Sequence, residues 1–161
     1  MTMAGYTTLE RIAVGGMGEV FLARQDGIGG FRRTVVLKRL LPDAEGDDDS
    51  VHRFLDEARV AGVLHHENVV AILEVGDDGA PFLALEYVHG ENAGRLRSLA
   101  KKKGVAIPVA VVARIIVDAA RGLAHAHEAR DVYGKALHSV HRDVAPKNIF
   151  VRADGTAKIG D

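Results

Sequence analysis

The chain has 161 residues, with 21 Lys and Arg against 22 Asp and Glu, so its net charge is −1. This balance argues against bulk electrostatic binding to nucleic acid or to an anionic membrane. The chain has no cysteine, which excludes disulfides, thiolate metal sites and a cysteine nucleophile. With 47% hydrophobic and 27% charged residues, the composition is that of a soluble globular protein.

Apolar runs typical of β-strands dominate the first half of the chain. Strands are predicted at residues 19–24, 34–41, 69–75 and 81–87. The last two are joined by Asp77-Asp78-Gly79, a hairpin-type turn. One helix is predicted between the second and third strands, because apolar residues recur there at helical spacing: Phe54, Leu55, Ala58, Ala61 and Leu64.

Helical patterns dominate the second half. His89-Gly90 is interpreted as a connector, and a short helix is predicted near residues 93–103. A longer helix is predicted from Pro108 to Ala129, with a buried stripe of Val112, Ile115, Ile116, Ala119, Leu123 and Ala126. Two short strands, residues 149–151 and 157–159, flank the turn at Asp154-Gly155. The sequence thus predicts a strand-rich part, residues 1–88, and a helical part, residues 89–161, with a hinge between them.

No segment resembles a targeting or membrane signal. The first residues lack a basic start followed by an apolar core, so they do not form a signal peptide. The most apolar stretch, residues 105–117, contains Pro108 and Arg114 and is too short to cross a bilayer. We therefore expect a cytoplasmic protein.

Two segments of the strand-rich part could bind phosphate. Residues 12–20 form a glycine-rich turn between strands, and glycine lets a backbone with free N–H groups lie close to phosphate oxygens. Lys38 ends an otherwise apolar strand, where an ammonium needs an anionic partner. Glu57 on the following helix can supply that partner. Taken alone, the turn is more often only a turn, and Lys38 is as often merely extended to solvent.

Two further segments could hold a catalytic carboxylate and a metal. His141-Arg142-Asp143 and Asn148 belong to a Pro-containing loop just before an apolar strand. That loop can place the Asp143 carboxylate near an acceptor hydroxyl while the Asn148 amide oxygen faces a metal. The hairpin at Asp154-Gly155 returns the chain, so Asp161 can lie beside Asn148 and share Mg²⁺ with it.

Together, in this order, the four segments resemble the signature set of protein kinases. More narrowly, the chain resembles the eukaryotic-like (Hanks-type) serine/threonine kinases of bacteria. The loop residues 15–21, the hinge-like Leu85-Glu86-Tyr87-Val88 and the extended residues 131–140 carry that resemblance. It implies an α+β fold with two lobes: a five-stranded antiparallel N-lobe with one helix, residues 1–88, and an incomplete helical C-lobe, residues 89–161.

The resemblance also implies a role for each matching residue. Asp143 would accept or orient the proton of the substrate hydroxyl, and Lys38, paired with Glu57, would hold the α- and β-phosphates of ATP. Asn148 and Asp161 would bind Mg²⁺. The ATP-binding set would be Ile12, Ala13, Val14, Gly15, Gly16, Met17, Gly18, Glu19, Val20, Val36, Lys38, Glu86 and Val88. Protein substrates are the expected partners, with regulatory or sensor domains in any longer parent chain.

Three positions depart from the family pattern. Ala13 replaces the first loop glycine, and Val36 replaces the alanine that usually precedes the lysine. Ala145 stands where serine/threonine kinases carry a lysine that steadies the γ-phosphate. Lys147 lies two residues later, where some tyrosine kinases place an arginine. We hypothesise that Lys147 supplies the missing charge, and this departure leaves the choice between Ser/Thr and Tyr acceptors open.

Two alternatives are retained. The chain could be a pseudokinase or nucleotide-binding scaffold, which Ala145 favours and the filled catalytic positions disfavour, or it could phosphorylate a small molecule. In the family, Asp161 would be followed by Phe-Gly and an activation segment, which the sequence does not contain. We therefore expect residues 1–161 alone to have little or no kinase activity, and the long helix to expose apolar residues.

Overall fold

The computed structural model describes residues 2–3, 5–15, 18–40 and 48–160 of the chain. It divides into two compact units. The first consists of residues 1–62 and 71–87, and the second of residues 63–70 and 88–161. The segment 63–70, which follows the first unit's helix in the sequence, therefore belongs to the second unit.

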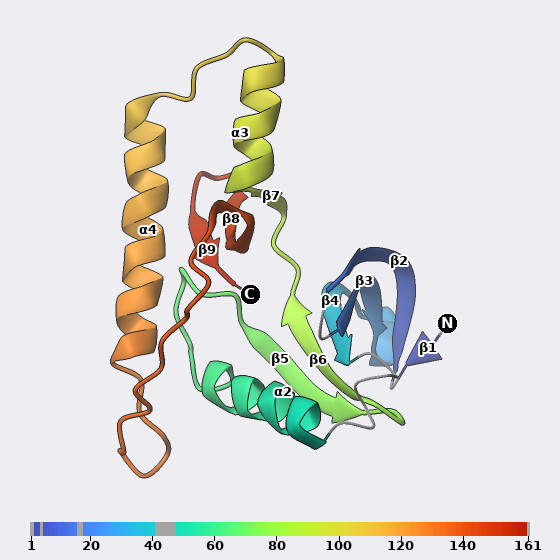
Figure 1. The fold of residues 1–161 in the computed structure, drawn as a ribbon. Helices are drawn as coiled ribbons and strands as arrows, with labels where there is room; N and C mark the ends of the chain where they lie inside the picture. The colour runs from blue at the N-terminus through green and yellow to red at the C-terminus, as the bar shows by residue number, and fades with distance from the viewer. Residues whose placement is uncertain (1, 4, 16–17, 41–47, 161) are drawn as a thin grey trace. The chain divides into compact units, whose positions relative to one another are not determined.

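The first unit is an antiparallel sheet with one helix, α2 (Asp48–Ala61) (Figure 1). The strand order is β1-β2-β3-β4-β6-β5. The strands are β1 (Thr2–Met3), β2 (Tyr6–Val14), β3 (Gly18–Asp26), β4 (Arg32–Leu40), β5 (Ile72–Asp77) and β6 (Pro81–Glu86), with a 3-10 turn, η1 (Ile28–Gly30), between β3 and β4. The expected five-stranded sheet is confirmed, and the two-residue β1 adds to its edge.

Two sequence predictions in this region are wrong in detail. The strand predicted at residues 69–75 begins only at Ile72, because Val69 and Val70 pair with Ile159 of the second unit. The predicted helical stripe ends early, because α2 stops at Ala61 and Leu64 packs in the core of the second unit. Both errors arise because apolar residues continue past the end of an element whose partners lie elsewhere in the sequence.

The two faces of the sheet build two apolar cores. Residues of β4 alternate, so Val35 and Leu37 enter one core while Lys38 lies on the opposite face. On the second face α2 contributes Phe54 and Ala58, which pack against Leu40 and Leu83.

Tyr6 is the one buried aromatic residue of the first core with a polar end. Its ring is buried and packs edge-on against Phe82, with ring centroids 6.0 Å apart. Its hydroxyl donates a hydrogen bond to Glu74 Oε2 at 2.5 Å. Burial, with the hydrogen bond to the Glu74 carboxylate, raises the pKa of Tyr6 to about 12.

This shift predicts a loss of stability at high pH. The folded chain holds the phenolic proton more tightly than the unfolded chain, whose tyrosine titrates near 10. The stabilisation by Tyr6 is therefore complete below pH 10 and is lost as the pH rises toward 12. In urea denaturation, the stability difference between the parent protein and Tyr6→Phe should shrink across this range. Tyr133→Phe, which removes the hydroxyl of a residue that is 91% exposed, is the matched control. A difference independent of pH would contradict the assignment.

The second unit contains a small sheet and two helices (Figure 1). The sheet is antiparallel in the order β7-β8-β9. Its elements are β7 (Gly90–Asn92), α3 (Ala93–Lys102), α4 (Val109–His127), the 3-10 turn η2 (Pro146–Asn148), β8 (Ile149–Arg152) and β9 (Ala157–Ile159). The predicted helices and both strands of the hairpin are confirmed.

The interpretation of Gly90 as connector is wrong. Gly90 begins β7 and pairs with Arg152 of β8. A Cβ at this position would lie 2.0 Å from the Val151 carbonyl oxygen, so the strand can approach β8 only as glycine. The chain then turns directly into α3, where the Asn92 side chain accepts a hydrogen bond from the Arg95 N–H at 2.9 Å.

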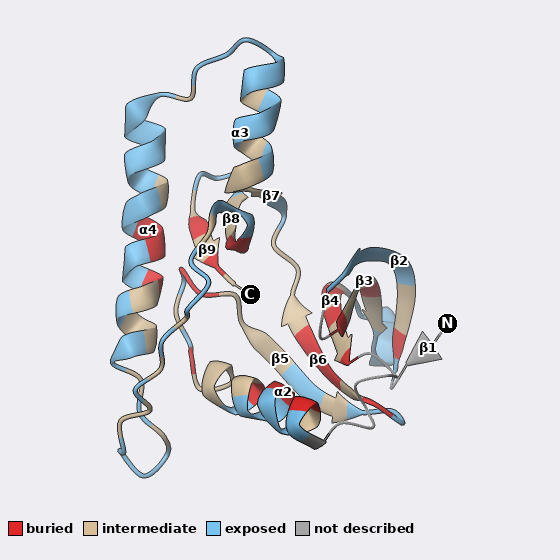
Figure 2. Cartoon of the chain, in the orientation of Figure 1, coloured by how far each residue is buried: buried red, intermediate tan, exposed pale blue. Residues whose placement is uncertain are grey.

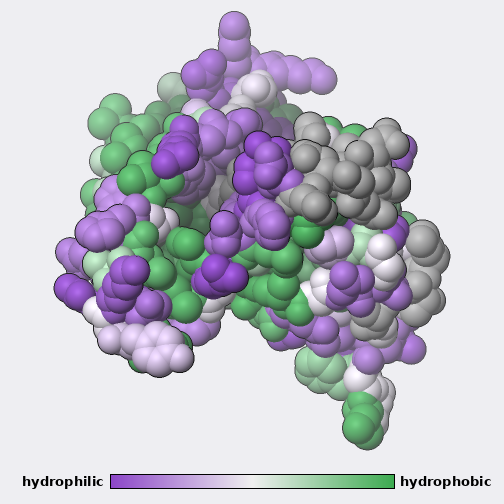
Figure 3. Space-filling model, turned by 60° about the horizontal axis from the view of Figure 1, so that its bottom comes forward, coloured by the Kyte–Doolittle hydropathy of each residue, from purple (hydrophilic) through white to green (hydrophobic). Residues whose placement is uncertain are grey.

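The predicted stripe of α4 is buried only in part. Ala119 is buried, but Val112 and Ile116 are 40% and 61% exposed. Figure 2 shows exposed positions along the N-terminal half of α4 and buried ones from its middle onward. The expected exposure of apolar residues on this helix is therefore confirmed. Figure 3 shows green, hydrophobic patches between the hydrophilic parts of the surface. Within the described residues, no helix has the length and apolar character that crossing a membrane requires.

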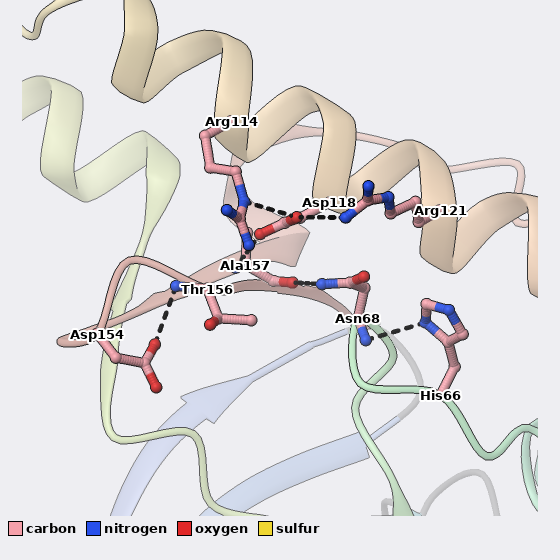
Figure 4. Close-up of polar contacts among 8 residues, drawn as sticks. All are labelled: His66, Asn68, Arg114, Asp118, Arg121, Asp154, Thr156 and Ala157. Carbon is pink, nitrogen blue, oxygen red and sulfur yellow. Dashed lines mark hydrogen bonds and ion pairs between the residues drawn. The ribbon is translucent and has the colours of Figure 1, made fainter.

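A buried carboxylate joins α4 to β9 (Figure 4). Asp118 Oδ2 accepts a hydrogen bond from the Ala157 N–H at 3.1 Å. Asp118 Oδ1 lies 2.9 Å from Arg114 Nε and 3.8 Å from Arg121 Nη1, one turn before and one turn after it. The two arginines are largely exposed, whereas the Asp118 side chain is 1% exposed. The arginines thus compensate a charge that is otherwise shielded from water.

The segment 63–70 packs against the same strand. Asn68 is buried, and its Nδ2 donates to the Ala157 carbonyl at 2.8 Å. Its carbonyl accepts the Ile159 N–H at 2.8 Å. A Cβ on Gly122 of α4 would lie 2.4 Å from that carbonyl oxygen. The backbone of α4 can therefore approach this segment so closely only with a glycine at position 122. Ala157 is therefore bonded on both sides, by Asp118 and by Asn68.

Replacing Asp118 should loosen β9. Asp118→Ala leaves the buried Ala157 N–H without an acceptor, at a cost of about 1–3 kcal/mol. Asp118→Asn keeps an acceptor oxygen and should cost less. We expect Asp118→Ala to lower the unfolding midpoint and to speed amide hydrogen exchange across residues 153–160.

The control is Glu128→Ala, which removes an exposed acid at the end of the same helix and should stay within about 0.5 kcal/mol of the parent. Equal protection of β9 in Asp118→Ala and Glu128→Ala would show that the carboxylate does not hold the strand.

Candidate functional site

The first unit places a lysine and a glutamate in direct contact. The Nζ of Lys38, on β4, lies 2.9 Å from Oε1 of Glu57, on α2. The Lys38 side chain is 15% exposed and that of Glu57 is 38% exposed. The predicted pair therefore forms, and it leaves an ammonium oriented by a carboxylate on the α2 side of the sheet.

Two apolar candidates share that face with Lys38. Val20 is opposite Lys38 in the β3–β4 register, and Val36 is opposite Leu22. Because side chains two residues apart point to the same face, Val20 and Val36 flank the lysine there. Both are partly buried.

The glycine-rich turn is described except for Gly16 and Met17, which lie outside the described residues. Ile12, Ala13 and Val14 end β2, while Gly18, Glu19 and Val20 begin β3. The Gly15 N–H donates to the Gly18 carbonyl at 2.8 Å, which closes the turn. A Cβ on Gly18 would lie 2.6 Å from the Arg39 carbonyl oxygen, so a glycine is required there.

The two hinge candidates fall in different units. Glu86 ends β6 in the first unit, where its Oε1 accepts the Ala71 N–H at 2.8 Å and its own N–H donates to the Ala71 carbonyl at 2.9 Å. Val88 begins the next part of the second unit.

The second unit assembles the loop around Asp143. Asn148 Nδ2 donates to the Asp143 carbonyl at 2.9 Å and to its Oδ2 at 3.1 Å. Lys147 Nζ lies 2.8 Å from the same Oδ2. Asn148 is buried, while Asp143 and Lys147 keep 53% and 67% of their side chains exposed. One carboxylate is thus fixed from two sides and remains accessible to solvent.

The turn η2 explains this arrangement. Ala145 is extended, Pro146 starts the turn, and the Asn148 N–H bonds back to the Ala145 carbonyl at 2.9 Å. The turn brings Lys147 and Asn148 back toward Asp143. Ala145, which departs from the family pattern, and Lys147, the hypothesised replacement for its missing charge, therefore belong to one local unit.

Arg142 has a strained backbone next to this carboxylate. Its φ is 60°, in the left-handed region that non-glycine residues rarely adopt. The Asp143 N–H bonds to the His141 carbonyl at 2.8 Å across it. Strain of this kind is typical of sites whose geometry is fixed by function.

The segment expected to approach Asn148 is described as far as Gly160. The Gly160 N–H donates to the Asn148 carbonyl at 2.9 Å, so the end of β9 lies against this loop. Asp161 itself lies outside the described residues. β9 is in turn held by Asp118 and Asn68, which the sequence analysis did not single out. The sequence feature that could have indicated Asp118 is the position of an acidic residue within the apolar stripe of the predicted helix.

The chain is similar to known proteins over nearly its whole length. A family model described as protein tyrosine and serine/threonine kinase matches residues 6–161. Tyrosine-protein kinase MasK of Myxococcus xanthus is 42% identical over 157 residues, which are 97% of this chain and 24% of MasK. Serine/threonine-protein kinase PknI of Mycobacterium tuberculosis is 33% identical over 152 residues, 94% of this chain and 24% of PknI.

Solved structures agree with these relatives. A crystal structure of the M. tuberculosis PknI kinase domain matches with a TM-score of 0.73 and 30% identity, over 100% of this chain and 59% of that one. The chain thus spans about a quarter of the curated relatives and about three fifths of a solved kinase domain. Since the family model covers nearly all of it, the chain belongs to the protein tyrosine and serine/threonine kinase family.

Proposed function

We propose that the protein is an ATP-dependent protein kinase that transfers the γ-phosphate to Ser/Thr hydroxyls of protein substrates. The observation that carries this proposal is the Asp143 carboxylate, fixed by Lys147 and Asn148 and still exposed. A carboxylate held in this way can accept or orient the proton of an incoming hydroxyl.

The residues present suit ATP and Mg²⁺. Among the described residues, both hydrogen bonds of the Asn148 side chain use Nδ2, so its Oδ1 is the atom that offers lone pairs. Mg²⁺ prefers oxygen ligands of this kind, with Asp161 proposed as its second protein ligand. When bound, the metal would neutralise charge on the β- and γ-phosphates. Lys38, oriented by Glu57, would hold the α- and β-phosphates.

The remaining nucleotide contacts come from the first unit and from Val88. Val20 and Val36 present apolar surface on the Lys38 face, which suits the adenine ring. The backbone at Glu86 and Val88 would receive the adenine edge. Residues 12–20 would cover the phosphates with backbone N–H groups.

Lys147 is proposed to supply the cation that the family usually places at position 145. Its Nζ already lies 2.8 Å from Asp143 Oδ2. A cation there can stabilise charge on the transferring phosphoryl group, which is the main catalytic contribution in this reaction.

A tyrosine acceptor is the second candidate. The lysine is at the position where some tyrosine kinases carry arginine, and MasK, at 42% identity, is named a tyrosine-protein kinase. The scaffold alternative predicts nucleotide binding without transfer, so one assay separates all three.

The test is transfer of labelled γ-phosphate by the full-length protein to generic acceptor proteins, followed by phosphoamino-acid analysis. Lys147→Ala should lower the transfer rate about 100- to 1,000-fold, the range found when one group that stabilises transition-state charge is removed. Lys147→Arg should recover much of the rate because it restores the cation. Acceptor proteins should carry phosphoserine or phosphothreonine, and phosphotyrosine beside them marks the tyrosine acceptor of the second candidate.

Asp143→Asn controls for contaminating kinases and should abolish transfer. Nucleotide binding without any transfer by the parent protein would favour the scaffold. An unchanged rate in Lys147→Ala would remove Lys147 from the mechanism without affecting Asp143.

A further inference from the structure

One tyrosine of this chain is displayed on the surface. The chain has three tyrosines, all described. Tyr6 is buried and its hydroxyl is bonded to Glu74, and Tyr87 is half-buried with an interaction of its own. Tyr133 is 91% exposed. No function described above uses it.

A short hairpin holds the backbone of Tyr133. Arg130 and Ala136 pair across it, and the Leu137 N–H closes it onto the Ala129 carbonyl at 3.0 Å, next to the end of α4. Asp131 Oδ1 accepts both the Tyr133 N–H and the Lys135 N–H at 2.9 Å. The hairpin therefore fixes the main chain at Tyr133 while its side chain extends into solvent.

The neighbours of the tyrosine can accommodate a new negative charge. Arg130 and Lys135 flank it in the sequence, and both are exposed. Arg130 Nη1 donates to the Gly134 carbonyl at 2.9 Å, so this guanidinium is held beside the tip. A phosphotyrosine carries about −1.5 to −2 charges at neutral pH and pairs well with such cations.

The hairpin tip is separated from the chain's own catalytic loop. In Figure 1 the hairpin, in orange, extends past the C-terminal end of α4 and away from β8 and β9. Asn148, which bonds Asp143, directly precedes β8. Because hydrogen bonds fix the tip, Tyr133 is better placed to enter the site of another molecule than its own.

We propose that Tyr133 is a phosphorylation site, modified by a second copy of this kinase. This inference rests on the proposed kinase activity and on its second candidate acceptor, tyrosine. The Tyr133 Oη would attack the γ-phosphorus of ATP held by the second copy and lose its proton to that copy's Asp143. The bond from the γ-phosphorus to the β,γ-bridging oxygen breaks, so the products are phosphotyrosine and ADP.

The experiment uses two full-length copies. The substrate copy is labelled with ¹⁵N and carries Asp143→Asn, so it can receive phosphate but not transfer it. The enzyme copy is unlabelled and active, and it is supplied with Mg²⁺ and ATP. Trypsin cleaves after Arg130 and Lys135, and the released peptide, residues 131–135, has Tyr133 as its only hydroxyl. Mass spectrometry then reads phosphate on the ¹⁵N-labelled form of that peptide.

We expect the labelled peptide to carry phosphate only when the active copy and ATP are both present. Tyr133→Phe in the substrate copy should remove this signal and leave the unfolding midpoint unchanged. Tyr133→Phe in the enzyme copy should transfer phosphate to a generic acceptor protein at the parent rate.

Two results would overturn the inference and are distinguishable. If generic acceptors or other peptides of the substrate copy are phosphorylated while residues 131–135 are not, Tyr133 is not a site, and the proposed kinase activity stands. If no acceptor of any kind receives phosphate, the proposed function itself fails, and the assignment of Tyr133 fails with it.

Discussion

The second unit depends on a carboxylate that is removed from water. Asp118 has a side chain only 1% exposed, and it holds the Ala157 N–H of β9 from the middle of α4. Burying a charge is costly unless it is paired, and two arginines of the same helix supply the pairing. Because Asn68 bonds Ala157 from the other side, β9 is fixed between a helix and a connecting segment.

The position of β9 matters because the loop that contains Asp143 and Asn148 lies against it. Gly160, one residue past β9, donates to the Asn148 carbonyl, and Asn148 in turn bonds Asp143. A chain of contacts therefore runs from Asp118 through Ala157 and the end of β9 to the Asp143 carboxylate. Apart from β9 and Gly160, which follow one another, the residues that make these contacts are not adjacent in the sequence. Asp118 is thus connected to the proposed site through this chain of contacts.

Local patterns predicted most of the elements, and long-range contacts account for what they missed. Helices α3 and α4 and strands β8 and β9 follow from periodicity and turn residues over a few positions. β7 was not predicted because Gly90 resembles a connector. Gly90 pairs with Arg152, and α3 and α4 lie between these two residues in the sequence. The pair Lys38–Glu57 was predictable because an isolated ammonium on an apolar strand needs a partner. The partner of Asp118, a backbone N–H 39 residues away, has no such local signal.

In the loop from Asp143 to Asn148, a cation two residues after position 145 contacts the Asp143 carboxylate. Lys147 is four residues after Asp143, and η2 brings its Nζ within 2.8 Å of Oδ2. The most direct test of this assignment is a crystal structure of the full-length protein with Mg²⁺ and a non-hydrolysable ATP analogue. We predict that Asn148 Oδ1 ligates the metal and that Lys147 Nζ contacts Asp143 or the γ-phosphate. A metal held without Asn148, or a Lys147 side chain turned away from both groups, would contradict it.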